Sequence, residues 1–492
     1  MSDGGRGEHV IAIDQGTTNT KAILVNSAGV VVAKASAPLK SSYPRPGWAE
    51  QSAEDIWASV QAVIADIVQR NSVAVAGLAI ANQRETLVVW DAETAKPITP
   101  AILWQCRRTA KACEALIAEG RDPMVVEATG LSINALFPAS KLAWVMENVP
   151  EAKPLAVQGR LRAGTVDSWL LYKLSNGREF ATDHSNASRT QLFNTATLKW
   201  DESLCELFGV PGAALPEVRF SDSRFGEVAE GATALKAGVP ILAMMGDSHA
   251  ALYGHRVRAP GLVKATYGTG SSLMTLTPGR VLSKNGLSST IAWSDGRGVA
   301  YALEGNITVS AQAASFAAEM LGLPDAQALS ALAQTVPDAA GVTFVPALAG
   351  LGAPHWNDNV SGTISGMTLA TTRAHIARAT LDAIVLQVSD VFVAMEKDLG
   401  ARLDGLLADG GASSNDFLMQ LQADVLDRPV TRSGQAEVGA IGVAMMALLS
   451  LHGDTPSLDE TRSEFQPRTD AAAWRTEATR GWQSLLARLI AN

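Results

Sequence analysis

Cysteine is scarce in this sequence, and the few thiols form no pattern typical of metal binding or disulfide pairing. Of 492 residues only three are cysteines, at Cys106, Cys113 and Cys205. They form no CxxC pair and no even set, which a disulfide framework requires. The seven histidines show no spacing typical of a zinc site. The sequence therefore predicts reduced thiols in a cytoplasmic protein.

Long hydrophobic runs and an excess of positive charge are also missing. The longest apolar run extends from Val438 to Leu451, whereas a membrane span needs about 20 residues, so we expect a buried helix there and no membrane segment. The first residues, MSDGGRGEH, have the features of neither a signal nor a transit peptide. The net charge of −9 argues against a nucleic-acid partner, which requires a basic face.

Length and composition are those of a globular protein with several domains. Hydrophobic residues make up 47% of the sequence and charged residues 18%, as in ordinary globular proteins. A chain of this length is too long for one hydrophobic core, so two or more domains are expected.

Predicted strands alternate with predicted helices, which is typical of α/β architecture. The segment from Val10 to about Ser36 predicts two or three strands. A helix is expected over about residues 53–69, with Ser52 as its cap. The apolar segment VAVAGLAIAN then predicts a buried strand that ends at Asn82.

Three predicted strands end in turns of small residues, two of them with a similar strand–turn–strand pattern. The turns are DQGTTNTK, TYGTG and ADGGASSND, the last of which leads into a helix capped near Ser413 or Ser414. One glycine-containing turn is ordinary, but three spread over both halves of the chain favour a binding role. Glycine allows close approach of the backbone, and clustered N–H groups bind phosphate oxygens. No Walker A or GxGxxG motif is present.

Eight short motifs together resemble one protein family. They are DQGTTNTK, ANQRET, ILWQCRRTA, TDHSNASRTQLFN, GDSHAAL, TYGTG, LGAPHW and DGGASSNDFLMQ. In this order they closely resemble the FGGY carbohydrate kinases, and within that family the glycerol kinases. The segment GTISGMTLATTRAHIARATLD resembles the C-terminal signature of the family. The resemblance extends from about His9 to Gln466.

The resemblance implies an α/β chain with an actin-like (ribonuclease-H-like) fold, in which two domains enclose an interdomain cleft. Residues 8–253 would form the N-terminal domain, which binds polyol and phosphate, and residues 254–492 the ATP-binding C-terminal domain. The domains would close on binding. The resemblance also implies a homodimer or homotetramer.

Two aspartates would carry the chemistry. Asp247 matches the family's catalytic base, which accepts the proton of a polyol hydroxyl as ATP phosphorylates it. Considered alone, Asp247 could equally cap the helix that follows it. Asp14 matches the carboxylate that holds the Mg²⁺ of Mg-ATP through water. It could also bond the amides of its own turn.

The remaining site residues follow the same correspondence. Matches to ATP-binding positions are Thr17, Thr18, Asn19, Lys21 and Thr269 for the phosphates, and Gly411 and Asn415 for adenosine. Matches to substrate-binding positions, besides Asp247, are Arg84, Glu85, Trp104, Leu136, Ser248 and Ser272. Without the resemblance, Arg84 and Glu85 could be a solvated charge pair and Trp104 a core residue.

Three of these positions depart from the glycerol-kinase pattern. Leu136 stands in place of a tyrosine, Ser248 in place of a glutamine and Ser272 in place of a phenylalanine. Together they predict a pocket larger than glycerol requires. Refilling of the pocket by His249 or Asn306 is the rival interpretation. The family's allosteric Gly-Gly-x-Arg loop is not matched by VAEGATALKAGVP.

The resemblance therefore predicts an ATP-dependent polyol kinase that requires Mg²⁺. Glycerol is the default substrate, and a larger acceptor such as erythritol, threitol, a pentitol or a ketopentose is the alternative. A chaperone-type ATPase of the same fold would need a peptide-binding domain, for which the chain after Gln466 leaves only a short helical tail. A catalytically silent sensor would not need Asp14, Arg84, Glu85 and Asp247.

Overall fold

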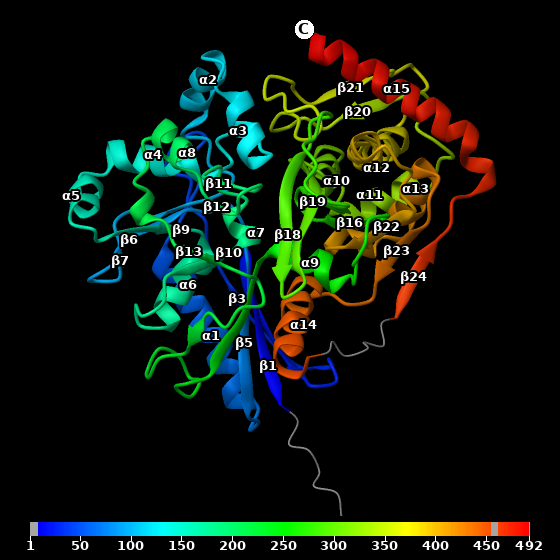
Figure 1. Ribbon diagram of the computed structural model, residues 1–492. Helices are drawn as coiled ribbons and strands as arrows, with labels where there is room; N and C mark the ends of the chain where they lie inside the picture. The colour runs from blue at the N-terminus through cyan, green and yellow to red at the C-terminus, as the bar shows by residue number, and fades with distance from the viewer. Residues whose placement is uncertain (1–7, 454–460, 492) are drawn as a thin grey trace, which may run out of the picture. The chain divides into compact units, whose positions relative to one another are not determined.

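Two units make up the chain in the computed structural model, which describes residues 8–453 and 461–491 (Figure 1). Unit 1 contains the chain up to Arg256, the segment Ser289–Tyr301 and a segment that begins at Glu437. Unit 2 contains Val257–Ser288, Ala302–Ala436 and the C-terminal residues. The boundary predicted between residues 253 and 254 stays a prediction.

The main sheet of unit 1 has six strands in the order β14-β15-β5-β1-β2-β3. The strands are β1 (His9–Gln15), β2 (Asn19–Asn26), β3 (Val31–Pro38), β5 (Val75–Asn82), β14 (Gly226–Glu227) and β15 (Pro240–Gly246). The strands β15, β5 and β1 run parallel, and most of their aliphatic side chains are buried. Such nearly continuous apolar runs are typical of parallel strands covered on both faces.

The parallel strands end at the same level of the sheet. Gln15 at the end of β1 is in register with Asn82 at the end of β5, and Asn82 is in register with Gly246 at the end of β15. The residues that follow these three strands therefore start from one edge, which we call the carboxyl edge of unit 1.

Helices cover this sheet and continue from its strands. Helix α1 (Ala53–Arg70) packs on β2 and β3, and Ser52 caps it by accepting a hydrogen bond from the N–H of Asp55 at 3.1 Å. Helix α9 (Asp247–Gly254) begins directly at the end of β15, and α14 (Val438–His452) lies beside β1 and β5 (Figure 1). The predicted cap at Ser52 and the predicted buried apolar helix are both confirmed.

Helices α9 and α14 touch through two glycines. A Cβ on Gly442 would lie 1.8 Å from the carbonyl oxygen of Ala250, and a Cβ on Gly254 would lie 2.4 Å from that of Val438. Both positions therefore exclude any side chain. This close contact holds the N-terminal turn of α14 beside the carboxyl edge.

Shorter elements complete unit 1 around a second apolar core, which includes Leu87, Val89, Ile102 and Leu142. The helices are α2 (Ala110–Ala118), α3 (Asp122–Thr129), α4 (Pro138–Asn148), α5 (Ala152–Val157), α6 (Val166–Leu174), α7 (His184–Ala187), α8 (Glu202–Phe208) and the 3₁₀ turn η1 (Gly212–Ala214). The strands are β4 (Glu50–Gln51), β6 (Val88–Asp91), β7 (Lys96–Pro97), β8 (Ala101–Ile102), β9 (Leu161–Gly164), β10 (Ala181–Asp183), β11 (Phe193–Asn194), β12 (Lys199–Trp200) and β13 (Glu217–Arg219).

The second large sheet has the order β18-β19-β17-β16-β22-β23-β24. Its strands are β16 (Leu262–Tyr267), β17 (Ser271–Thr277), β18 (Ser288–Asp295), β19 (Gly298–Ile307), β22 (Gly405–Asp409), β23 (Val430–Ser433) and β24 (Arg462–Phe465). The other elements are β20 (Thr343–Val345), β21 (Thr363–Ser365), α10 (Ala311–Met320), α11 (Ala326–Ala333), α12 (Arg373–Leu399), α13 (Asp416–Leu426), α15 (Ala472–Ala491) and the 3₁₀ turns η2 (Gly411–Ser414) and η3 (Thr469–Ala471). Helix α12 supplies much of the apolar core of unit 2.

The predicted strands around the small-residue turns are confirmed, but one helix cap is wrong. The side chain of Asn415, and not that of Ser413 or Ser414, caps α13 by accepting a hydrogen bond from Leu418 N at 3.1 Å. The two serines instead close the preceding turn, since Ser413 Oγ donates to Gly410 O at 2.7 Å and Ser414 Oγ donates to Gly411 O at 2.8 Å.

The three cysteines are free, as the sequence predicts, and the structure shows that they are buried. Within the two described ranges, every helix is too short or too polar to cross a bilayer.

Substituting Gly442 by alanine should destabilise the protein, because the new methyl group would collide with the backbone of α9. We expect a loss of about 3 kcal/mol in the free energy of unfolding, the upper end of the range for overpacked sites. Urea unfolding measures this loss. Gly296→Ala is the matched control, since a Cβ there meets no atom within 4 Å. Equal stability of Gly442→Ala and the control would contradict the close helix contact.

Candidate functional site

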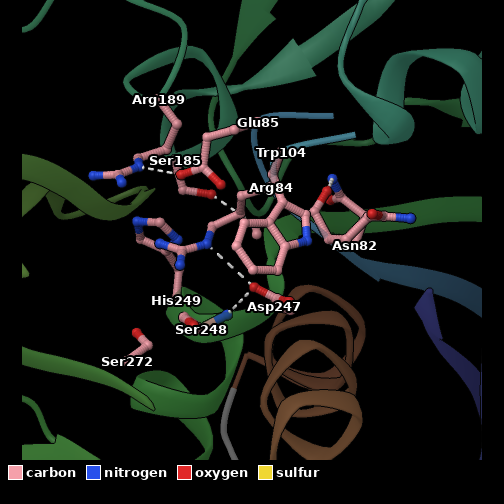
Figure 2. Close-up of polar contacts among 12 residues, drawn as sticks. Asn82, Arg84, Glu85, Trp104, Ser185, Arg189, Asp247, Ser248, His249 and Ser272 are labelled. Carbon is pink, nitrogen blue, oxygen red and sulfur yellow. Dashed lines mark hydrogen bonds and ion pairs between the residues drawn. The ribbon is translucent and has the colours of Figure 1, made fainter. Parts of the chain in front are cut away.

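Charged side chains meet at the carboxyl edge of unit 1. Arg84 follows β5, Asp247 follows β15, and Arg84 Nε lies 3.2 Å from Asp247 Oδ1 (Figure 2). The side chain of Arg84 is only 7% exposed, whereas that of Asp247 is 38% exposed. The edge therefore presents an accessible carboxylate that is oriented by a buried guanidinium.

Asp247 is the first residue of α9 and not its cap. The N-cap position belongs to Gly246, and Asp247 Oδ1 accepts a hydrogen bond from the N–H of Ser248 at 2.6 Å. The helix-cap interpretation of Asp247 is therefore wrong. Both contacts reach the same carboxylate oxygen, which gives the group a defined direction.

Gly246 allows the arginine to lie over the end of β15. A Cβ at this position would lie 2.7 Å from both Cγ and Cδ of Arg84 and 2.8 Å from Nδ1 of His249. His249 itself is fully buried, with Nε2 3.2 Å from Thr290 Oγ1. Any larger residue at position 246 would displace Arg84 from the carboxylate.

Glu85 is buried and held in an unusual backbone conformation. Its φ angle of +60° is in the left-handed region, which non-glycine residues rarely adopt. Its Oε1 accepts a hydrogen bond from Arg189 Nε at 2.6 Å (Figure 2). Since Glu85 is 4% exposed and Arg84 is 7% exposed, the interpretation of these residues as a solvated charge pair is wrong.

Lys141, which the sequence did not single out, lies directly behind this turn. Its Nζ donates to the carbonyl oxygens of Glu85 at 2.9 Å and of Leu136 at 2.7 Å. Burial lowers the pKa of Lys141 to about 7, and the nearby charge of Glu85 opposes this shift only in part. The residue follows Leu136 in the motif INALFPASK, but nothing in that motif shows which carbonyls the lysine bonds.

A buried polar network joins the ends of β5 and β15. The side-chain amides of Asn82 and Asn186 bond each other at 3.0 and 3.1 Å, and Asn186 also donates to Asp183 at 2.9 Å. Ser185 Oγ donates to Asp183 and accepts from the N–H of Gly246, both at 3.0 Å. The sequence signal for this network is the high density of polar residues in TDHSNASRT. A buried segment accommodates so many polar side chains only when they hydrogen-bond one another.

Trp104 reaches the turn after β1. Its indole nitrogen donates to Thr17 Oγ1 at 2.9 Å, and Thr17 Oγ1 donates to Gln83 Oε1 at 3.2 Å. Trp104 is half-buried and belongs to this polar cluster rather than to the apolar core. Thr17 thereby links the turn after β1 with the residues after β5.

The turn after β1 presents polar groups outward. Thr18 and Asn19 are exposed, and Lys21 Nζ lies 3.0 Å from Glu437 Oε2. Asp14 lies near the N-terminal turn of α14, where a Cβ on Gly439 would come within 3.5 Å of Asp14 Oδ2. The N-terminus of a helix favours negative groups, phosphates included.

The carboxylate of Asp14 is of the kind that hydrated magnesium takes. No group of three or more histidine, cysteine, aspartate or glutamate side chains that could hold a metal occurs among the described residues. Mg²⁺ usually keeps several waters and takes one or two carboxylates together with substrate phosphates. The single half-buried carboxylate of Asp14, beside the N-terminal turn of α14, fits that requirement.

In unit 2 the turn Gly268-Thr269-Gly270 rests on the start of α10. The carbonyl oxygen of Gly268 accepts from Ala311 N at 3.1 Å, and that of Thr269 accepts from Ser310 N at 2.9 Å. The side chain of Thr269 is exposed. The backbone of this turn is therefore immobilised while its hydroxyl faces outward.

The third small-residue turn lies at the same edge of unit 2. Strands β16 and β22 run parallel with Thr266 opposite Asp409. Gly410 has φ +88°, and a Cβ on it would lie 2.5 Å from Tyr267 O, so the two turns are in contact. Gly411 borders open space, and Asn415 Nδ2 donates to Ser330 Oγ at 2.8 Å. The structure thus brings Thr269 close to the segment that carries Gly411 and Asn415.

The three departures from the glycerol-kinase pattern have defined surroundings. Leu136 is half-buried, and its N–H bonds Asn134 Oδ1 at 2.9 Å. Ser248 is half-buried at the start of α9. Ser272 Oγ donates to Oε1 of the fully buried Glu304 at 2.9 Å.

The stability of the protein should rise with pH above 7 because of Lys141. In the unfolded chain this lysine keeps its proton up to its ordinary pKa of 10.5, whereas the folded protein releases the proton near pH 7. The unfolded state therefore binds more protons over this interval, and raising the pH favours folding. Between pH 7 and 9 the free energy of unfolding of the wild type should therefore rise by about 2 kcal/mol relative to that of Lys141→Met. Denaturant unfolding of both proteins at both pH values measures this rise. The same difference in unfolding free energy between the two proteins at pH 7 and at pH 9 would contradict the prediction.

Comparison with known proteins places the chain in a family. Residues 9–254 match the N-terminal domain of the FGGY family of carbohydrate kinases, and residues 263–451 match its C-terminal domain. An apulose kinase of Pectobacterium atrosepticum is 48% identical, with 89% of this chain and 88% of that protein aligned. A glycerol kinase of Symbiobacterium thermophilum is 44% identical, with 96% and 99% aligned.

A solved structure agrees with this assignment. The crystal structure of Plasmodium falciparum glycerol kinase with ADP superposes with a TM-score of 0.91 at 30% identity, covering 98% of each chain. The chain therefore belongs to the FGGY family of carbohydrate kinases, ATP-dependent phosphotransferases with an actin-like fold of two domains.

Proposed function

We propose that this kinase phosphorylates a terminal hydroxyl of a small polyol or ketose longer than glycerol, with Asp247 as the general base. The observation that carries the catalytic part is the contact between Arg84 and Asp247 at the carboxyl edge of unit 1. A carboxylate that is both accessible and oriented can accept the proton of a hydroxyl as the bond to phosphorus forms.

The side chains around Asp247 supply what an acceptor with several hydroxyls requires. Arg84 offers N–H donors, and Glu85 offers carboxylate acceptors held by Arg189. The half-buried ring of Trp104 can pack on the carbon chain of the acceptor. The acceptor hydroxyl gives its proton to Asp247, its oxygen bonds the γ-phosphorus of ATP, and ADP leaves with the electrons of the broken P–O bond.

ATP is the phosphoryl donor, and we assign its contacts by the family correspondence. Thr17, Thr18, Asn19, Lys21 and Thr269 would contact the phosphates, and Gly411 and Asn415 the adenosine. Lys21 would exchange its ion pair with Glu437 for a phosphate oxygen. Asp14 would hold hydrated Mg²⁺, which neutralises phosphate charge when bound.

The proposed length of the acceptor rests on the three departures. Leu136 supplies no hydroxyl donor where the glycerol pattern has tyrosine. Ser272 directs its short side chain to Glu304 where that pattern has a phenylalanine wall. Ser248 replaces the longer glutamine. These changes remove bulk and matched hydrogen bonds, and a site that lacks a matched hydrogen bond loses discrimination for the smaller substrate.

The relatives support both acceptor classes. The relative named apulose kinase supports apulose as an acceptor, and the relatives named glycerol kinase support glycerol, which is the second candidate. Membership of a carbohydrate-kinase family argues against the chaperone-type ATPase and the silent sensor. The homodimer or homotetramer and the cytoplasmic location stay predictions.

An acceptor panel tests the proposal. ADP release with Mg-ATP should be measured with glycerol, erythritol, both threitols, xylitol, ribitol, xylulose, ribulose and apulose. We expect a four- or five-carbon acceptor to exceed glycerol by at least about tenfold in kcat/KM, the size of effect that one lost pocket contact gives. Asp247→Asn should lose at least about 100-fold in kcat, as expected for a general base. A clear preference for glycerol would overturn the longer acceptor, and an active Asp247→Asn would overturn the base.

Gly246→Ala should impair catalysis through Arg84. The methyl group would displace the guanidinium that orients Asp247, so we expect kcat to fall by at least about tenfold, as displacement of a positioned group does. The KM for ATP should change little. Steady-state kinetics measures both values, with Gly296→Ala as the control. Unchanged kcat in a folded Gly246→Ala protein would refute the orienting role of Arg84.

A further inference from the structure

Lys141 occupies a position that neither helix stability nor packing explains. It is the fourth residue of α4, in the first turn, where the helix dipole disfavours a cation. Its side chain is fully buried, and burying an ammonium group is costly unless it is well bonded. A methionine or leucine would fill the same space without these costs. The role of this lysine must therefore lie in the hydrogen bonds that its side chain donates.

The two acceptors of Lys141 belong to separate parts of the proposed acceptor site. One is the carbonyl oxygen of Glu85, in the turn after β5, and the other is that of Leu136, in the loop before α4. The ammonium group therefore joins the backbone that carries a proposed substrate carboxylate to the backbone that carries a proposed pocket wall.

Further contacts attach both of these segments to a third, which carries Arg189 and Thr190. Arg189 bonds the carboxylate of Glu85 at 2.6 Å, and its guanidinium carbon lies 5.2 Å from the ring centre of Phe137. The N–H of Ala139 donates to Thr190 O at 2.9 Å. The start of α4 is thus attached both to the carbonyl of Glu85 and to the segment that holds its carboxylate.

The backbone of Glu85 depends on such anchors. A glutamate at φ +60° is strained, and strain of this kind persists only when the surroundings define the conformation. Arg189 holds the side chain and Lys141 holds the carbonyl. Loss of the second anchor would let the turn relax and move the carboxylate, even though Lys141 touches no substrate.

We propose that Lys141 is a positioning residue that sets the separation between the Glu85 carboxylate and the Leu136 side chain, and with it the length of acceptor that the site prefers. This inference rests on the proposed function. It predicts that removing the N–H donors of Lys141 changes acceptor selection while ATP binding is unaffected, because the hydrogen bonds of Lys141 reach the backbone of Glu85 and Leu136 and not the turns proposed to bind ATP.

The test is Lys141→Met, which is unbranched like lysine, one atom shorter, and lacks donors. We expect KM for the preferred acceptor to rise about tenfold, as one lost buried hydrogen bond gives, with KM for ATP within about twofold. The kcat/KM ratio between that acceptor and glycerol should shrink about tenfold as well. Lys173→Met is the matched control, since Lys173 lies 3.2 Å from Glu54 at the surface of unit 1. A purely structural role would raise both KM values or leave the acceptor ratio unchanged, and either result overturns the inference.

A milder variant keeps the inference testable if Lys141→Met does not fold. Asn134 is half-buried and bonds the N–H of Leu136, so Asn134→Ala loosens the same loop without touching the core. It should raise KM for the acceptor about threefold, as a partly exposed hydrogen bond gives, and leave KM for ATP unchanged. An unchanged acceptor KM would overturn the inference. If the wild type phosphorylates no acceptor of the panel, the proposed function fails instead, so the two failures are distinguishable.

Discussion

The proposed site depends on one constraint, which is that three parallel strands end in register at the same edge of the sheet. Gln15, Asn82 and Gly246 are in register, so the residues that follow them leave the sheet at one edge. Arg84 and Asp247, which follow two of these strands, and Asp14, the last residue but one of the third, thereby come from segments far apart in sequence to one place. A shift of one residue in any of the three strands would point its side chains to the opposite face and separate the groups.

The charged side chains buried at this edge orient the groups of the proposed site. Arg189 and Lys141 are fully buried, and Glu85 and Arg84 are nearly so. Such groups contribute little net stability, since desolvation offsets their attraction. They do keep polar groups in one orientation before a substrate arrives, which is what stabilising a developing charge requires. The polar network of Asp183, Ser185 and Asn186 extends the same principle to the strand ends.

The sequence predicts those parts of the structure that depend on neighbouring residues. Strand ends at Asn82, the cap at Ser52 and the apolar helix from Val438 all follow from local patterns. The partners of Glu85 do not, because Lys141 is 56 residues away and Arg189 is 104 residues away. The cap of α13 was misassigned because serine and asparagine both suit such a position, and only the turn geometry selects Asn415. The segment that begins at Glu437 belongs to unit 1 although the residues before it belong to unit 2, and the composition of the sequence does not indicate this change.

The central claim is that Asp247 and its neighbours at the carboxyl edge receive the acceptor. A crystal structure with the preferred acceptor, Mg²⁺ and a non-hydrolysable ATP analogue tests it most directly. The account predicts a primary hydroxyl of the acceptor within about 3 Å of the Asp247 carboxylate, the distance of a proton-transfer hydrogen bond, and inner hydroxyls on Arg84 and Glu85. An acceptor bound with its primary hydroxyl away from Asp247 would contradict the account.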